Sequence, residues 1–178
     1  MGIDLEERTD FRRPTISKWR APRAVVDSNA GIIIATAEVD VSPDRVFRAF
    51  TTDEVERWWG HPDFYRWTDW KADLRVCGPW SVVVRFADGS TNGGNGEFAE
   101  IDVPRKLVMT RRFKQHPLLG TRETTITYRF DAVATGTRIT VRDEGFIGRH
   151  EAAYGNAEHW ERVLTWLDMF LKNENSNS

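Results

Sequence analysis

The longest regular hydrophobic pattern lies near the end of the chain, over residues 150–172. When successive residues are placed 100° apart around a helix axis, one face is mainly apolar and the opposite face is charged. The inner face holds Ala153, Asn156, Ala157, Trp160, Val163, Leu164, Leu167, Phe170 and Leu171. The pattern predicts an amphipathic helix about 33 Å long, which one twisted sheet could cover along its whole length.

The inner face of this predicted helix is graded in side-chain size. Its second half carries large apolar residues, whereas its first half offers only Ala153, Asn156 and Ala157. Small residues over an apolar interior are what a small-molecule cavity would show in sequence. The alternative is that aromatic side chains from the sheet fill this space.

The first half of the chain predicts one strand and two short helices. Residues 31–41 are apolar and then alternate, which is typical of a strand. Ser42, Pro43 and Asp44 form a helix start, with Ser42 as the N-cap of a helix over residues 43–50. A second short helix follows and ends near Gly60.

Period-two alternation dominates the stretch between these helices and residue 147, and no helical pattern interrupts it. The alternating runs are Trp70, Ala72 and Leu74; Trp80, Val82, Val84 and Phe86; Leu107, Met109, Arg111 and Phe113; Ile126, Tyr128 and Phe130; and Ile139, Val141 and Asp143. Gly93, Gly94 and Gly96, with Asn92 and Asn95, are expected to form a loop and the entry to a strand. Strands joined by turns predict an antiparallel meander.

The length and composition fit one domain of ordinary size, with 178 residues, 40% hydrophobic and 29% charged. We expect a partly disordered N-terminal arm over residues 1–28, a domain over residues 29–173 and a disordered tail over residues 174–178. The arm contains Arg12, Arg13, Lys18, Arg20 and Arg23. It is either a solvated tail or a basic segment for a partner or a phosphate.

Charge and hydropathy narrow the function classes. A net charge of −2 argues against general affinity for nucleic acid or anionic membranes. No apolar run approaches the roughly 18 residues of a membrane span, and the first ten residues do not resemble a signal peptide, so a cytoplasmic location is expected. Cys77 is the only cysteine, which excludes internal disulfides and thiolate zinc sites, and we expect it to be a small buried residue.

Six short motifs, in this order along residues 30–172, resemble one known family. They are Ala49-Phe50-Thr51-Thr52, Trp58-Trp59-Gly60, Asp73-Leu74-Arg75 before Gly78, Ile101-Asp102-Val103-Pro104-Arg105-Lys106-Leu107, Gly136-Thr137-Arg138-Ile139-Thr140-Val141 and Glu144-Gly145-Phe146. The chain resembles the START-like (SRPBCC, Bet v 1-like) superfamily, and within it the branch named after the C-terminal domain of the activator of heat-shock protein 90 ATPase.

Two positions depart from the family pattern. Cys77 stands where the family usually has a glycine, and His159 stands where it usually has a glycine before Trp160. The separate N-terminal domain of true chaperone activators has no counterpart here, so co-chaperone activity is not implied.

The resemblance implies an α+β helix-grip fold. In this fold a curved antiparallel sheet, here of about six to seven strands, wraps around the long C-terminal helix, and two short helices follow the first strand. The superfamily hosts ligand binding, polyketide cyclase or aromatase activity and hydrolase-like activity, so the fold alone does not choose among them.

Two charged residues fall on the inner face of the predicted sheet. If Leu107, Met109 and Phe113 face inward, so does Arg111, and Asp143 likewise shares a face with Ile139 and Val141. A buried unpaired charge is costly, so these two should pair with each other, with another inner polar group, or with water and ligand in a cavity. The alternative is a bulge that turns one of them outward.

Catalytic and cofactor signatures are not found in the sequence. His150 and His159 are not at metal-ligand spacing, and His61 and His116 each precede a proline. No nucleophile elbow or paired carboxylate motif occurs. We therefore predict no metal, no cofactor and no dedicated catalytic residue, and leave open whether the protein is an enzyme.

The leading hypothesis is that a small hydrophobic or aromatic ligand binds between the sheet and the C-terminal helix. The predicted ligand-binding residues are Trp59, Trp80, Met109, Arg111, Phe113, Tyr128, Asp143, Asn156 and Trp160. One alternative is a cyclase-like or hydrolase-like enzyme that uses Asp143 or His159 as proton carrier. Another is a chaperone-associated interaction module. A homodimer and a chaperone partner stay open.

Overall fold

The computed structural model describes residues 21–176, so the predicted basic arm lies largely outside the described residues. Within this range the chain forms one sheet of nine antiparallel strands in the order β1-β2-β9-β8-β7-β6-β5-β4-β3. The strands are β1 Arg23–Asp27, β2 Ile32–Val39, β3 Gly60–His61, β4 Tyr65–Ala72, β5 Pro79–Phe86, β6 Thr91–Asp102, β7 Lys106–Phe113, β8 Thr124–Val133 and β9 Gly136–Glu144. The α+β helix-grip prediction is confirmed, with more strands than expected.

The additional strands lie at the two edges of the sheet. β1 falls in the stretch assigned to the N-terminal arm, and β3 has only two residues. β1 alternates between exposed and half-buried positions and has no fully buried residue, so its sequence carries little apolar periodicity. Its pairing with β2 and a hydrogen bond from the Ala24 backbone N–H to Glu161 Oε1 (2.8 Å) hold it in place. The two short helices accordingly follow the second strand.

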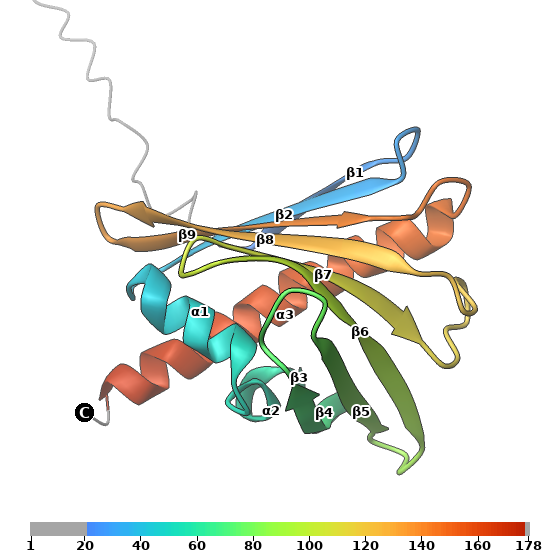
Figure 1. The fold of residues 1–178 in the computed structure, drawn as a ribbon, viewed down its shortest axis with the longest axis horizontal. Helices are drawn as coiled ribbons and strands as arrows, with labels where there is room; N and C mark the ends of the chain where they lie inside the picture. The colour runs from blue at the N-terminus through green and yellow to red at the C-terminus, as the bar shows by residue number, and fades with distance from the viewer. Residues whose placement is uncertain (1–20, 177–178) are drawn as a thin grey trace, which may run out of the picture.

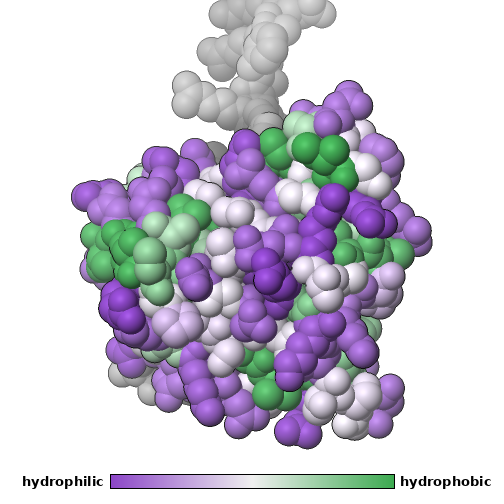
Figure 2. All heavy atoms as spheres, turned by 45° about the vertical axis from the view of Figure 1, so that its right-hand side comes forward, coloured by the Kyte–Doolittle hydropathy of each residue, from purple (hydrophilic) through white to green (hydrophobic). Residues whose placement is uncertain are grey.

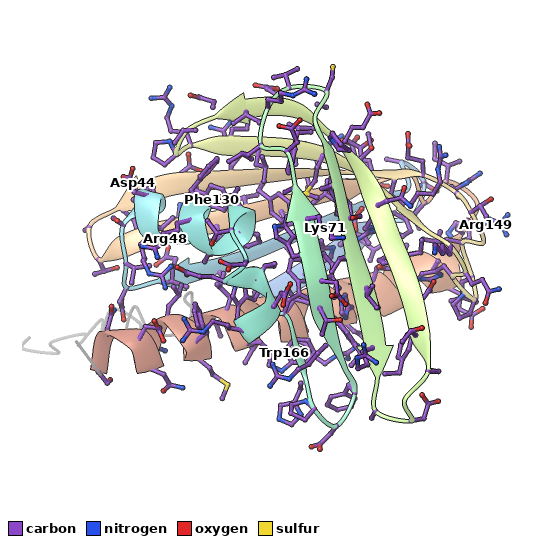
Figure 3. The ribbon with its side chains drawn as sticks, turned by 60° about the horizontal axis from the view of Figure 1, so that its bottom comes forward. Asp44, Arg48, Lys71, Phe130, Arg149 and Trp166 are labelled. Atoms are coloured by element: carbon purple, nitrogen blue, oxygen red, sulfur yellow. The ribbon has the colours of Figure 1, made fainter. Side chains whose placement is uncertain are left out.

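The helices lie on one face of the curved sheet (Figure 1). They are α1 Pro43–Thr51, α2 Val55–Trp58 and α3 His150–Ser176. The predicted N-cap is confirmed, because Ser42 Oγ accepts a hydrogen bond from the Arg45 backbone N–H (3.3 Å). Phe47 and Phe50 of α1 pack on Phe130 of β8, which Figure 3 shows beside α1. None of the helices within residues 21–176 is long and apolar enough to cross a membrane.

Helix α3 runs along the sheet, and its C-terminal end lies on the side of the molecule that carries α1 (Figure 1). The predicted amphipathic helix is confirmed, and it ends at Ser176 rather than at Lys172. Trp160, Val163, Leu164 and Leu167 are fully buried, so the second half of α3 supplies much of the core. Full burial of each such side chain contributes about 1.5–3 kcal/mol to folding.

The glycines of residues 93–96 belong to strand β6 and not to a loop, which corrects the sequence prediction. A Cβ on Gly96 would lie 1.9 Å from the Thr110 carbonyl oxygen and 2.7 Å from Trp80 Nε1, and a Cβ on Gly94 would lie 2.9 Å from the Phe113 ring. Strand glycines of this kind allow large neighbours to approach the backbone closely. They make room here for two aromatic side chains.

Cys77 is exposed, so the prediction of a buried cysteine is wrong. It lies in the turn between β4 and β5 with φ +61°, in the left-handed region that favours glycine. This geometry gives a physical reason for the glycine that the family usually has at this position.

Candidate ligand-binding site

A pocket of about 820 Å³ lies between the first half of α3 and strands β4–β7. Aromatic and aliphatic side chains and one arginine line the sheet side, and polar side chains and the segment between β7 and β8 line its rim. The sheet side comprises Trp59, Tyr65, Trp67, Val84, Phe86, Arg111 and Phe113; the rim comprises Ser90, Thr91, Asn92, Lys114, Gln115, His116, Pro117, Leu118, Gly120 and Thr121. Figure 2 shows the end of the molecule where α3 begins, where hydrophilic residues separate small apolar groups.

The helix side of the pocket is made of one narrow stripe of α3. Ala152, Gly155, Asn156 and His159 line it, at the spacing i, i+3, i+4 and i+7 that places residues on one face. A Cβ on Gly155 would meet nothing within 4 Å. Gly155 is exposed and Ala152 is buried, so the stripe runs from the core to the open side of the pocket.

Arg111 and Asp143 both face inward and form a buried ion pair. Arg111 Nη2 lies 2.8 Å from Asp143 Oδ2, and Arg111 Nε donates to Thr124 Oγ1 (3.1 Å). The side chains are 5% and 0% exposed, respectively. The inward orientation predicted from strand alternation is confirmed, and no bulge turns either residue outward.

Asp143 is enclosed by the core. The indole N–H of Trp160 also donates to Asp143 Oδ2 (2.9 Å), while Oδ1 has no hydrogen-bond partner among the described residues. Burial raises the pKa of Asp143, and the positive charge of Arg111 opposes this rise. Asp143 does not line the pocket, so it acts on the pocket only through Arg111.

Tyr65 and His159 form a hydrogen-bonded pair on the pocket wall, with 3.0 Å between the Tyr65 hydroxyl oxygen and His159 Nε2. Burial raises the pKa of Tyr65. Burial and nearby positive charges, first that of Arg111, lower the pKa of His159 to about 3. Both groups are therefore uncharged at neutral pH.

The Trp59 ring stacks on Trp67, with ring centroids 4.0 Å apart and an interplanar angle of 12°. Its indole N–H is buried and has no hydrogen-bond partner among the described residues. Trp58, by contrast, donates from Nε1 to the Ala49 carbonyl oxygen (2.9 Å) and anchors α2 to α1. Of these adjacent tryptophans, one therefore locks the short helices and the other reaches the pocket.

Four of the predicted ligand-binding residues line this pocket and five lie in the core. Those in the lining are Trp59, Arg111, Phe113 and Asn156. Those in the core, and outside the lining, are Trp80, Met109, Tyr128, Asp143 and Trp160. Alternation fixes which face a strand residue is on, but not its depth beneath the helix.

Asn156 forms its hydrogen bond within α3 and not with the Arg111–Asp143 ion pair. Its Nδ2 donates to the Ala152 carbonyl oxygen of the same helix (2.9 Å). Within residues 21–176 it makes no hydrogen bond to Arg111 or Asp143. Its predicted grouping with these charges is therefore not seen as a direct contact.

Several lining residues were not predicted from the sequence. Tyr65 and Trp67 lie on the first half of β4, and the sequence analysis began this strand at Trp70. The alternation of Tyr65 and Trp67 could have extended it. His159 was considered as a proton carrier and was left out of the predicted ligand-binding residues, although it departs from the glycine that the family usually has there.

A metal site would need several His, Cys, Asp or Glu side chains close together. Among the described residues, no group of three or more His, Cys, Asp or Glu side chains is placed to hold a metal ion. The pocket is lined instead by aromatic rings and hydrogen-bond donors.

Solved structures with the same fold come from several bacteria. Protein Ms6760 from Mycobacterium smegmatis has a TM-score of 0.72 and 22% identity, covering 85% of this chain and 97% of its own. A protein from Arthrobacter aurescens has a TM-score of 0.73 and 22% identity, covering 84% and 91%. The AHSA1 protein from Silicibacter pomeroyi has a TM-score of 0.66 and 20% identity, covering 80% and 99%. At these identities the likeness shows the fold alone.

No curated protein is significantly similar to this chain in sequence. The sequence model of the family described as "Activator of Hsp90 ATPase homolog 1-like protein", however, matches residues 40–172. This match spans both short helices, strands β3–β9 and almost all of α3. The chain therefore belongs to the Activator of Hsp90 ATPase homolog 1-like protein family.

Proposed function

We propose that this protein binds a small, mainly apolar or aromatic molecule in the pocket between α3 and strands β4–β7. The observation that carries the proposal is the pocket itself, a space of about 820 Å³ that Ala152, Gly155, Asn156 and His159 of α3 line opposite aromatic side chains. Pockets for small organic molecules commonly measure about 300–1,000 Å³ and are lined by apolar and aromatic side chains with a few polar groups. This pocket has both features.

The lining supports an aromatic or flat apolar ligand body. Trp59, Trp67, Tyr65 and Phe113 present rings to the space, and aromatic faces pack well against other rings. Arg111 at the inner wall supplies hydrogen-bond donors that would orient one end of the ligand. Such an arrangement combines an unspecific apolar wall with one specific anchor.

The experiment is native mass spectrometry of the freshly purified protein, followed by a thermal-shift screen with aromatic and aliphatic metabolites. We expect a co-purified species or a saturable stabilisation. A ligand at a hundred times its Kd adds about 2.7 kcal/mol to the free energy of unfolding. The same compounds are then tested against Gly155→Leu, whose side chain would project into the pocket.

The matched control for this variant is Gly155→Ala. Both substitutions remove a helical glycine and should stabilise α3 by up to about 1 kcal/mol, but only leucine fills the space. Binding that survives in Gly155→Ala and is lost in Gly155→Leu supports the proposal. If no compound binds, or if Gly155→Leu binds as the wild type does, this pocket is not the ligand site and the protein-interaction alternative takes the lead.

A second candidate function, an enzyme of the cyclase or hydrolase kind, is favoured by one observation, the Tyr65–His159 pair on the pocket wall. Acid–base groups work best when their pKa lies near the operating pH. Burial moves the pKa of Tyr65 up and that of His159 down, away from neutrality. We therefore rank binding first. Tyr65→Phe separates the two, since it would abolish turnover by an enzyme but only change affinity in a binding protein.

A further inference from the structure

The charged side chains that line the pocket are all basic. Arg111 lies on the inner wall and Lys114 at the rim, and His116 and His159 also contribute to the lining. Among the described residues that line the pocket there is no aspartate or glutamate. Asp143, the carboxylate that pairs with Arg111, is fully buried and outside the lining.

Arg111 keeps part of its donor capacity for the pocket. Its Nε donates to Thr124 Oγ1 and its Nη2 to Asp143 Oδ2. Its Nη1 makes no hydrogen bond to any residue in the described part of the chain. The guanidinium carbon lies 5.6 Å from the centre of the Phe113 ring, which also lines the pocket. A planar guanidinium held in this way is well suited to bind an oxygen anion.

The charge of Arg111 acts on neighbouring pocket residues although Arg111 is paired with Asp143. After burial, the positive charge of Arg111 is the next cause of the lowered pKa values of His159 and His116. The negative charge of Asp143 is not among the causes for either histidine. The charge of Arg111 therefore affects these two pocket residues more than the charge of Asp143 does.

We infer that the ligand is an amphipathic anion, with an apolar or aromatic body against the tryptophans and a carboxylate or similar oxyanion on Arg111. This inference rests on the proposed function and names its ligand class. A cationic ligand would be repelled by the positive charges of Arg111 and Lys114, and a purely apolar one would leave the free N–H groups of Arg111 without an acceptor. Lys114 at the rim adds a second positive charge that favours the entry of anions.

The experiment compares three compounds of one shape by isothermal titration calorimetry with the wild-type protein. They are 2-naphthoic acid, which is an anion at pH 7, the neutral 2-naphthamide, and the cationic 2-(aminomethyl)naphthalene. Since a charge-assisted hydrogen bond is about twice as strong as a neutral one, we expect the acid to bind roughly tenfold tighter than the amide. The amine should bind weakest.

Two variants test the role of Arg111. Arg111→Met/Asp143→Asn removes both charges and should abolish the preference for the acid over the amide. Asp143→Asn alone leaves Arg111 without its anionic partner and should strengthen binding of the acid. Far-UV circular dichroism and the melting transition establish that each variant is folded. The comparison of the three compounds with the wild-type protein does not depend on the variants.

The outcomes separate the two proposals. If the acid binds tightest and the preference disappears in the double variant, the inference holds. If the amide or the amine binds as tightly as the acid, the anionic ligand class is overturned while binding in the pocket stands. If none of the compounds binds and the metabolite screen is also negative, both proposals are overturned.

Discussion

The guanidinium of Arg111 donates to the carboxylate of Asp143 across 2.8 Å, and both side chains are buried beneath the first half of α3. β8 lies between their strands in the sheet, so the contact spans two strand spacings on the inner face. The indole N–H of Trp160 donates a hydrogen bond to the same carboxylate oxygen. The pair therefore ties β7, β9 and α3 together at the inner end of the pocket.

Removing one member of this pair should be more harmful than removing both. We expect Arg111→Met to lower the free energy of unfolding by about 3–5 kcal/mol, because it leaves a buried carboxylate without its counter-charge. Arg111→Met/Asp143→Asn should lose clearly less than the sum of the two single variants. Urea denaturation at pH 7 measures all of these. Additive losses would show that the two groups do not interact.

The pH dependence of stability should carry a signature of His159. Its pKa is about 3 in the folded protein, against 6.5 for an ordinary histidine. Between these values the unfolded chain binds a proton that the folded chain does not, so His159 lowers stability as the pH falls from about 6.5 towards 3. His159→Gln removes this penalty. We therefore expect its effect on the free energy of unfolding to be about 1–2 kcal/mol more favourable at pH 5 than at pH 7.5.

The matched control for this measurement is His150→Gln at the exposed start of α3. The groups that bear on His159 are Tyr65 on β4, Arg111 on β7, Arg162 on its own helix and His116 between β7 and β8. Urea unfolding at both pH values gives the comparison. An equal pH effect in the wild type and in His159→Gln would contradict the assignment.

Trp80 should prove to be a core residue and not a ligand contact. It is 2% exposed, stacks with Trp70 at 5.6 Å and donates from Nε1 to the Thr110 carbonyl oxygen (2.9 Å). We expect Trp80→Ala to lower the free energy of unfolding, measured by urea denaturation, by about 3–5 kcal/mol. Trp70→Ala, at a half-buried position of the same stack, should cost less. A loss below about 1 kcal/mol for Trp80→Ala would contradict this placement.

The turn between β4 and β5 offers a stabilising substitution. Cys77 has φ +61°, so Cys77→Gly removes the strain of a side chain in the left-handed region and should raise stability by about 0.5–1 kcal/mol. The neighbouring Gly78→Ala should lower the free energy of unfolding by about 1–3 kcal/mol, because the alanine Cβ would lie 2.0 Å from the Asp73 carbonyl oxygen. Thermal and urea unfolding measure both. A destabilised Cys77→Gly would show that the turn is not strained.

The fold was predictable because its main signals are local and periodic. The apolar stripe from Ala153 to Leu171 predicts α3, and Ser42 before Pro43 predicts the start of α1. The alternation around Arg111 also predicts correctly that a charge faces inward. The edge strand β1 was missed because only Ala24 and Val26 of this short strand pack against the core, and neither is fully buried.

The depth of side chains under α3 was not predictable in the same way. Met109 and Arg111 share one face of β7, but only Arg111 reaches the pocket. Which of the two lies under the small residues of α3 depends on where the helix crosses the sheet. This crossing is a long-range relationship that no local pattern contains. The assignment of Gly94 and Gly96 to a loop failed for a similar reason, since their neighbours Phe113 and Trp80 belong to other strands.

The two halves of α3 have separate tasks, and this division bears on how such a protein evolves. Val163, Leu164 and Leu167 are fully buried and hold the sheet, whereas Gly155, Asn156 and His159 border the pocket. Mutations at Gly155 and Asn156 change the shape of the pocket at little cost to folding, because the first position is exposed and the second is half-buried. A lineage could therefore exchange one ligand for another through a few point mutations within one helical stripe, while the rest of the helix preserves the fold.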